Sequence, residues 1–311
     1  MKRDLVGGVG RVGRPVAALL IMVLAALTGC QPAAPPAQEI LPRSELLARY
    51  NARATAIAQL SAPCHIAARF PKMDRNGIPI KGQYETWSLD GTFVFRKQRD
   101  LYLVGEAFSS PVFGLGSNSE MYWFWVRPGM STEYFGRYDG PGAKKFAIRP
   151  DYLLETLGVY PVTTDVDVWA FRRGDDRDII QIMDVDVSQP EPNFSPDKVA
   201  VVLGLREEIH LERVHHDPVE VRLYDPAGEP ILVSQLLDYA QVGEVRLPTK
   251  LVYRFVEADA LFTLSLRDIS LTKKLKDAAF AYRPGEVKTH RNLDEPAAAS
   301  VTPPAPGAEK K

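Results

Sequence analysis

Apolar and polar residues alternate one by one along many short segments of this chain, and this pattern limits it to folds built of β-strands. The segment from Leu261 to Arg267 is the clearest example. One side of it carries three apolar residues and the other side three polar ones, namely Phe262, Leu264 and Leu266 against Thr263, Ser265 and Arg267. Side chains alternate across a strand, so the pattern predicts one buried face and one wet face.

The predicted strands fill the middle of the chain, at residues 66–70, 84–89, 92–96, 101–107, 121–126, 132–138, 166–172, 179–187, 205–213, 219–224, 251–256 and 261–267. Their connections are short, and one of them is a turn at Asp90-Gly91, which favours antiparallel neighbours. Helical spacing predicts one helix that begins at the N-cap Ser44 and a short one over 150–157 that ends at Gly158. A flat sheet this wide would be unusual, so we expect a strongly curved sheet or a barrel.

Composition excludes several classes of protein. The chain has 311 residues, and its 38 Lys and Arg against 39 Asp and Glu leave a formal charge of −1, so no global field attracts nucleic acid. The hydrophobic fraction of 45% is typical of a folded protein. Cys30 and Cys64 are the two cysteines, and Cys64 is interpreted as a small buried residue rather than a reactive thiol.

The amino-terminal segment has the pattern of a bacterial lipoprotein signal. Positive charges precede a short apolar run that ends at Leu27-Thr28-Gly29-Cys30. We expect residues 1–29 to be a signal peptide and Cys30 to be the lipidation site. Residues 30–41 form a Pro/Ala-rich tether, 42–293 one folded domain, and 294–311 a disordered tail. This predicts a lipid-anchored envelope protein, at the periplasmic face of the outer membrane.

The folded region resembles the LolA/LolB superfamily of lipoprotein carriers. The resemblance is one of pattern, carried by the leading helix, the Ala-Arg-Phe strand, residues 111–117 before Tyr122-Trp123-Phe124-Trp125, and later by Asp268-Ile269-Ser270-Leu271, residues 274–277, Phe280 and residues 283–287. It implies an α+β fold that is mainly antiparallel β, a strongly curved incomplete (half) β-barrel with covering helices. It also implies an apolar concave face that holds acyl chains of lipids or lipoproteins.

Acylation of Cys30 would decide between the two roles known in that superfamily, a soluble carrier and a receptor held at the membrane. A protein held by two or more acyl chains stays on its membrane and does not shuttle. The resemblance therefore implies a receptor-like role in lipoprotein localisation, with a periplasmic carrier protein as the implied protein partner. One feature departs from the pattern, since the early turns at 72–77 and 89–91 carry no protruding bulky apolar residue for insertion into the membrane.

Two sets of residues are candidates for binding acyl chains. The aromatic strand 121–126 places side chains on both faces, so it either lies in a core under a helix or lines a cavity. The same two alternatives hold for the apolar faces of 251–256 and 261–267. The candidate residues are Trp123, Trp125, Leu251, Tyr253, Phe255, Phe262 and Leu264.

An Asp-rich hairpin turns at Gly174-Asp175-Asp176-Arg177. A turn centred there pairs residues whose numbers sum to about 351, which sets Asp167 opposite Asp184 and Asp165 opposite Asp186. Opposed like charges need solvent, a neighbouring Arg or Lys, or a hard cation such as calcium. Solvent or an ion pair is the favoured interpretation, and no metal site is assigned.

Motifs for catalysis are not found, because the chain has no Gly-x-Ser-x-Gly elbow and no His-Glu-x-x-His pair. We therefore expect no enzyme and no cofactor. The predicted function is binding of acyl chains in an apolar cavity of an outer-membrane-type lipoprotein. The alternative is an envelope lipoprotein that uses the same scaffold as a structural or protein-interaction module, without lipid transfer; a hydrolase built on the Asp-rich hairpin ranks third.

Overall fold

The computed structural model describes residues 38–73, 79–127, 132–142, 149–163, 167–188, 200–282 and 287–295. The chain divides into two units, Met1–Gln38 and Glu39–Lys311, and the fold that follows belongs to the second unit. The predicted signal peptide, Cys30 and the residues after 295 lie outside the described residues. In the described part of the chain, no helix combines the length and the apolar character needed to cross a membrane.

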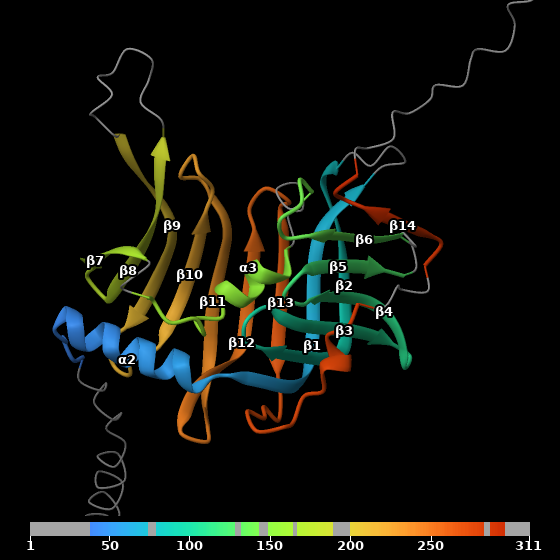
Figure 1. Ribbon diagram of the computed structural model, residues 1–311. Helices are drawn as coiled ribbons and strands as arrows, with labels where there is room; N and C mark the ends of the chain where they lie inside the picture. Colours follow the sequence, from blue (N-terminus) through green and yellow to red (C-terminus); the bar gives the residue numbers. More distant parts are fainter. Residues whose placement is uncertain are drawn as a thin grey trace, which may run out of the picture. The chain divides into compact units, whose positions relative to one another are not determined.

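The second unit is built on one sheet of 14 strands in the order β14-β6-β5-β4-β3-β2-β1-β13-β12-β11-β10-β9-β8-β7 (Figure 1). The strands of its first half are β1 (Gln59–Met73), β2 (Pro79–Arg96), β3 (Asp100–Ala107), β4 (Ser110–Ser117), β5 (Met121–Val126) and β6 (Thr132–Arg137). Those of its second half are β7 (Val168–Arg173), β8 (Arg177–Ser188), β9 (Ala200–Glu212), β10 (Pro218–Tyr224), β11 (Pro230–Val242), β12 (Val245–Phe255) and β13 (Ala260–Leu266).

The two halves join where β1 pairs with β13, with Cys64 opposite Leu266 and Ile66 opposite Leu264. The strand β14 (Thr289–Asn292) forms the edge of the first half and pairs in parallel with β6. The other described pairings are antiparallel. The edge strands β14 and β7 do not pair with each other, so the sheet is not closed. The predicted unclosed, mainly antiparallel architecture is therefore confirmed.

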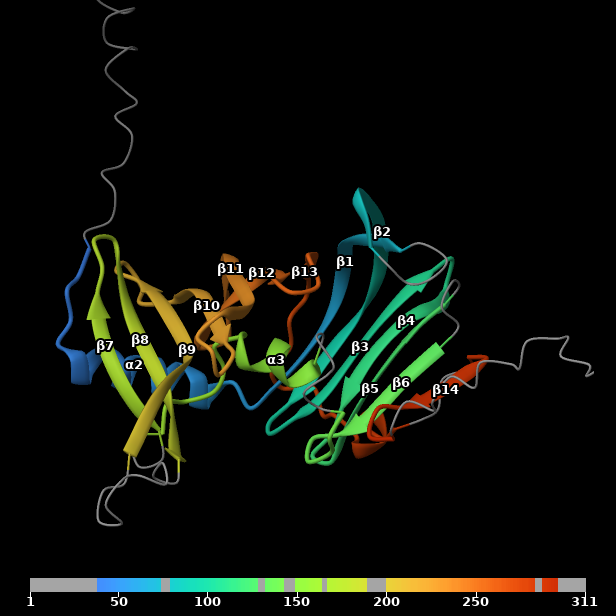
Figure 2. The same ribbon diagram turned by 90° about the horizontal axis from the view of Figure 1, so that it is seen from above.

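Strong curvature bends both halves of the sheet to the same side (Figure 2). The ring centroids of Phe113 on β4 and Phe262 on β13 lie 6.1 Å apart. Three strands separate β4 from β13 in the sheet, and strands in a flat sheet are spaced by about 4.8 Å, so these rings would be about 19 Å apart without bending. We call the face that carries both rings the concave face and the opposite one the outer face.

In the described part of the chain, two α-helices cover part of the concave face. The helix α2 (Arg43–Ala56) buries Leu46, Leu47, Tyr50 and Ala54, one side of a helix at the 3.6-residue period. The hydroxyl of Tyr50 donates to the carbonyl of Tyr160, and the Asn51 amide exchanges two hydrogen bonds with Val162. These bonds fix α2 to the segment that follows α3 (Pro150–Glu155), which lies between the two limbs of the sheet (Figure 2).

The hydrophobic core lies between these helices and the concave face. Helix residues such as Leu46 and Leu154 belong to one buried cluster with strand residues such as Phe93, Leu103 and Leu251. Cys64 belongs to the same cluster with 0% exposure, which confirms the expectation that it is a buried residue. Burial raises the pKa of its thiol to about 12, so it stays protonated and unreactive.

Several predicted boundaries need correction. Residues 84–96 are not two strands, because β2 runs through Asp90 and Gly91 without a turn. Ser44 is not the N-cap of α2, since Pro42 holds that position and makes no side-chain capping bond. The sequence analysis also missed β4, β11 and β14, and a short 3-10 helix at Asp277–Ala279. The other predicted strands are confirmed, although β1 begins at Gln59 rather than at residue 66 and β12 begins at Val245 rather than at residue 251.

Candidate functional site

The structure places five of the predicted acyl-binding residues on the concave face. Leu251 stands opposite Leu264, and Tyr253 opposite Phe262, in the pairing of β12 with β13. Phe255 follows two residues after Tyr253 and therefore shares its face. Four of the five are core residues with at most 3% exposure, namely Leu251, Tyr253, Phe255 and Leu264. Phe262 is only half-buried.

Trp123 and Trp125 lie on the outer face, so the structure separates them from the other five candidates. A Cβ atom on Gly116 would lie 2.3 Å from the Trp123 ring, and one on Gly114 would lie 2.3 Å from the Trp125 ring. Each indole therefore lies flat over a glycine of β4. The neighbouring Phe124 stands opposite Leu115 and faces the concave side.

The indole of Trp123 is covered by the carboxyl-terminal part of the chain. Its ring centroid lies 5.5 Å from that of Tyr282, whose hydroxyl donates to the buried carboxylate of Glu133. His290 on β14 contacts the same carboxylate at 2.7 Å. Trp123 thus belongs to a packed layer between β5 and the returning chain, whereas the Trp125 ring is contacted by the guanidinium of Arg127, 5.0 Å from its centroid.

A row of four aromatic rings crosses the concave face. It runs from Phe124 to Phe113, Phe262 and Tyr253, with successive centroids 5.7, 6.1 and 6.2 Å apart. Phe124 and Phe262 are half-buried, whereas Phe113 and Tyr253 are buried. Burial raises the pKa of the Tyr253 hydroxyl, so this residue stays neutral. We call these four residues the aromatic row.

Phe70 and Trp87 add a second pair of half-buried rings, 5.1 Å apart, on the same face. The concave face therefore ends in an apolar surface that the two helices leave partly open. Such a surface contacts hydrocarbon without needing directed polar bonds. Phe113 and Phe124 were not among the predicted binding residues. The alternation of Phe113 with Gly114, and of Phe124 with Trp125, does indicate that each phenylalanine lies on the opposite face from its neighbour.

A protruding apolar residue was not predicted from the sequence, but Phe108 is one in the structure. This side chain is 104% exposed, at the two-residue turn Phe108-Ser109 between β3 and β4. Both residues adopt left-handed backbone angles, with φ of 51° and 62°. Such turns favour Asn and Gly, and a bulky residue at positive φ is strained. Neither burial nor turn preference explains a phenylalanine at this position.

The Asp-rich hairpin has the predicted register. Trp169 pairs with Ile182 and Phe171 with Ile180, as expected for a turn centred between Asp175 and Asp176. Arg206 offsets two of the four predicted carboxylates, since its guanidinium lies 3.3 Å from Asp167 and 3.4 Å from Asp184. Asp165 and the side chain of Asp186 lie outside the described residues. The described residues contain no group of three or more ligands that fits a metal ion.

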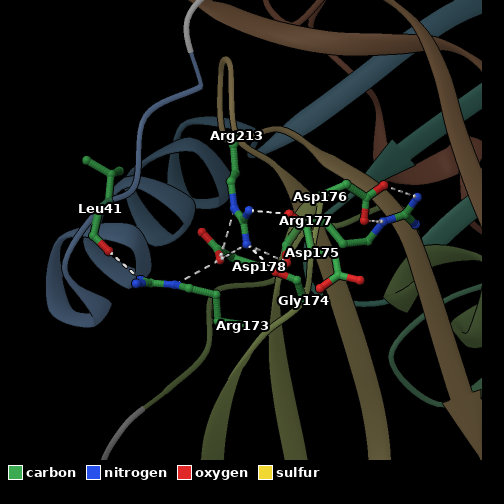
Figure 3. Close-up of polar contacts among 8 residues, drawn as sticks. All are labelled: Leu41, Arg173, Gly174, Asp175, Asp176, Arg177, Asp178 and Arg213. Carbon is green, nitrogen blue, oxygen red and sulfur yellow. Dashed lines mark hydrogen bonds and ion pairs between the residues drawn. The ribbon is translucent and has the colours of Figure 1, made fainter.

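Arg213 holds the tip of this hairpin in place (Figure 3). Its guanidinium donates to the backbone carbonyls of Gly174 and Asp175 at 2.6 and 2.7 Å, and to the carboxylate of Asp178 at 3.1 Å. Asp178 is fully buried, and Arg173 contacts it at 3.4 Å while donating to the carbonyl of Leu41. The cluster therefore ties the hairpin to the start of α2.

No protein-family model matches the chain, and no curated protein is similar enough to count as a match. Among solved structures it is similar to that of a LolA superfamily protein from Nitrosomonas europaea, with 11% identity, a TM-score of 0.47, and coverage of 78% of this chain and 99% of that one. A DUF1329 family protein from Desulfovibrio piger has 11% identity and a TM-score of 0.45, covering 76% and 95%. What the chain shares with both proteins is a likeness of fold.

Proposed function

We propose that this protein binds acyl chains of lipids or lipoproteins on the aromatic row and acts as a receptor-like component of lipoprotein localisation. The observation that carries the proposal is the row itself, in which Phe124 and Phe262 remain half-buried although they adjoin a packed core. Burying each methylene of a bound chain against such rings contributes about 0.8 kcal/mol. A hydrocarbon chain laid along the row would complete the core that α2 and α3 leave open.

The proposed ligand contacts differ from the first set of candidate residues. Phe262 and Tyr253 stay in the set, and Leu251, Phe255 and Leu264 support them from the core. Trp123 and Trp125 drop out, because they face the other side of the sheet. Phe113 and Phe124 take their place.

Phe108 supports delivery to a membrane. A fully exposed phenylalanine at the tip of a hairpin can insert its ring at the interface between lipid and water. Lipidation at Cys30 would hold the protein at the same membrane, so that ligand passes over a short distance. Mass measurement of the amino-terminal peptide, after extraction of the full-length protein from membranes, tests the anchor.

The ligand proposal is tested with a matched pair of variants. Phe262→Ser removes a half-buried ring of the aromatic row, and Leu261→Ser removes the neighbouring apolar residue, which is 38% exposed on the outer face. We expect Phe262→Ser to weaken binding of a palmitoylated lipopeptide about tenfold or more, since a Phe side chain contributes about 1.5–3 kcal/mol on burial. Leu261→Ser should leave binding unchanged.

The alternative role, a structural or protein-interaction module, predicts a different effect of these variants on lipid binding. Under that role neither variant changes the amount of lipid that co-purifies with the protein. Native mass spectrometry of the full-length chain, showing no bound lipid or lipopeptide for any variant, would therefore refute acyl-chain binding. The fold of each variant is checked by circular dichroism.

A further inference from the structure

A cavity of about 300 Å³ opens beside α3, and its walls come from elements far apart in the sequence. Arg99 contributes from the turn between β2 and β3, Glu155 from α3, and Glu207 from β9. Tyr160 and Ile182 supply its less polar part. None of these residues belongs to the aromatic row, so this cavity is a separate place in the fold. Its size is at the lower end of small-molecule sites.

Glu207 is the most unusual group in the cavity. In the sheet it stands opposite Ile182 on one side and Leu223 on the other, so it faces inward among apolar residues. It is 8% exposed, and among the described residues its carboxyl group has no hydrogen bond and no ion pair. Burying a carboxyl group without a hydrogen-bond partner lowers the free energy of unfolding by several kcal/mol.

The next residue in the same strand, Glu208, has a carboxylate with several hydrogen-bond partners. Glu208 points to the other face and is held by Gln181, His210 and Tyr224. These contacts, led by the hydrogen bond from His210, lower the pKa of Glu208 to about 2. The missing partners of Glu207 are therefore a property of the cavity and not of β9.

The charges that face Glu207 come from each element around the cavity. The lining carboxylates Asp151 and Asp167 are already paired, the first with Arg149 and the second with Arg206. Glu155 of α3 has no ion pair among the described residues, and Arg99 lies over the Tyr138 ring at 4.5 Å. The guanidinium groups of Arg99 and Arg206 also line the cavity, but among the described residues neither forms an ion pair with Glu155 or Glu207.

The protonation of these two groups agrees with the geometry. Burial, and then the charge of Asp151, raise the pKa of Glu155 to about 7. Burial, and then Glu155, raise the pKa of Glu207 to about 8, although Arg206 opposes the shift. At neutral pH both groups hold protons for part of the time. A positively charged ligand would oppose both shifts, because it stabilises the ionised form of each carboxyl group.

We propose that this cavity binds a small aliphatic ammonium ligand, with Glu155 and Glu207 as its counter-charges. An ammonium group carries three N–H donors, which suit carboxylate acceptors that have no partner. A metal ion fits less well, because the described residues offer no group of three or more metal ligands. Tyr160 and Ile182 provide the surface for the aliphatic part of the ligand.

Binding must release protons, because the ligand competes with them for the two carboxylates. Amines of this class stay charged up to about pH 9, whereas Glu155 and Glu207 ionise fully only above about pH 8. The affinity should therefore rise by about tenfold or more between about pH 6 and pH 8.5. A neutral ligand of the same shape would show no such rise.

The experiment is calorimetric titration of the detergent-solubilised full-length protein with putrescine, and with butanediol as the neutral match. We expect putrescine to bind at about pH 8.5 with proton release at neutral pH, and butanediol not to bind. Glu207→Gln and Glu155→Gln should each weaken putrescine binding about tenfold or more, by removal of one charge pair. Glu244→Gln, in the exposed turn after β11, is the matched control and should change nothing.

Three results would overturn this proposal: no heat of binding for putrescine at any pH, equal binding of butanediol, or undiminished binding by Glu207→Gln. The glutamine variants stay informative if the native protein folds, since removing the ionised group relieves a buried charge and should not harm stability at alkaline pH. Failure here leaves acyl-chain binding untouched, because the two sites share no residue.

Discussion

Gly91 on β2 lies directly opposite Gly105 on β3. A Cβ atom on Gly91 would lie 2.0 Å from the carbonyl oxygen of Val104, and one on Gly105 would lie 2.8 Å from the Leu89 side chain. The two backbones approach more closely than any side chain allows. This contact lies where the sheet bends, since the pairing of β3 with β4 shifts register just after Gly105. The glycine pair therefore permits the curvature that brings Phe113 to Phe262.

Gly91→Ala should destabilise the protein strongly, because the clash is with backbone that has no room to move. We expect a loss of about 3 kcal/mol or more in the free energy of unfolding, measured in urea. Gly204→Ala is the matched control, since a Cβ there meets no atom within 4 Å. That variant should be neutral or slightly stabilising, and an equal effect of both changes would show that the glycine pair does not set the bend.

The affinity for acylated ligands should rise with chain length. If the aromatic row holds hydrocarbon by burial, each added methylene contributes up to about 0.8 kcal/mol, which is about fourfold in the dissociation constant. Fluorescence competition with lipopeptides of increasing acyl length measures the slope. A flat response from the shortest to the longest chain would contradict binding on the row.

Phe108→Asn should change stability and membrane binding in opposite directions. Asparagine tolerates the left-handed angle at this turn, so the variant should gain about 1 kcal/mol in the free energy of unfolding. Association with liposomes should fall, and flotation of a Cys30→Ala background measures it without the anchor. Leu261→Ser in the same background serves as the control, and equal loss in both variants would remove Phe108 from the mechanism.

Arg213→Ala should cost about 3 kcal/mol or more, because it leaves the fully buried Asp178 without its main partner. Arg177→Ala removes a neighbouring arginine whose partner, Asp176, is mostly exposed. That change should cost less than about 1 kcal/mol. Urea unfolding of the two variants in parallel distinguishes the buried Arg213–Asp178 pair from the exposed Arg177–Asp176 pair, both of which are labelled in Figure 3.

Because the pKa values of Glu155 and Glu207 are raised in the folded protein, the free energy of unfolding should fall as the pH rises. Below about pH 4.5 both groups are protonated whether the chain is folded or not, so their effect there is nil. As the pH rises, the unfolded chain loses these protons first, and stability falls until about pH 8, where folded Glu207 also ionises. The loss from Glu207 amounts to about 5 kcal/mol.

Glu207→Gln should remove most of that loss, so the variant is more stable than the native protein above neutral pH. Unfolding in urea at a series of pH values checks this expectation, with Glu244→Gln as the unchanged reference. A native curve without any fall between about pH 5 and pH 8 would show that the two carboxyl groups are not shielded from water.

The hairpin from Asp167 to Asp184 is a part of the fold whose strand pairing could be predicted from local sequence. A tight turn sets the register of the two strands that it joins, so the pairing of Trp169 with Ile182 follows from residues close together in the chain. The same holds for β5, whose bounds at Met121 and Val126 match the prediction. In contrast, the turn expected at Asp90-Gly91 is wrong, because Gly91 serves a bend within β2 and not its end.

Alternation of apolar and polar residues was enough to predict a mainly antiparallel sheet and to locate most of its strands, but it missed β4, β11 and β14. Contacts between residues far apart in the chain set the pairing of β1 with β13 and the side of β5 that faces inward. The tertiary structure also brought Glu155 and Glu207 to one cavity, from residues 52 positions apart (207 − 155). The physical reason is that alternation specifies two faces of a strand but not which one becomes concave. That choice is made by contacts between distant strands, at the bend that the glycine pair allows.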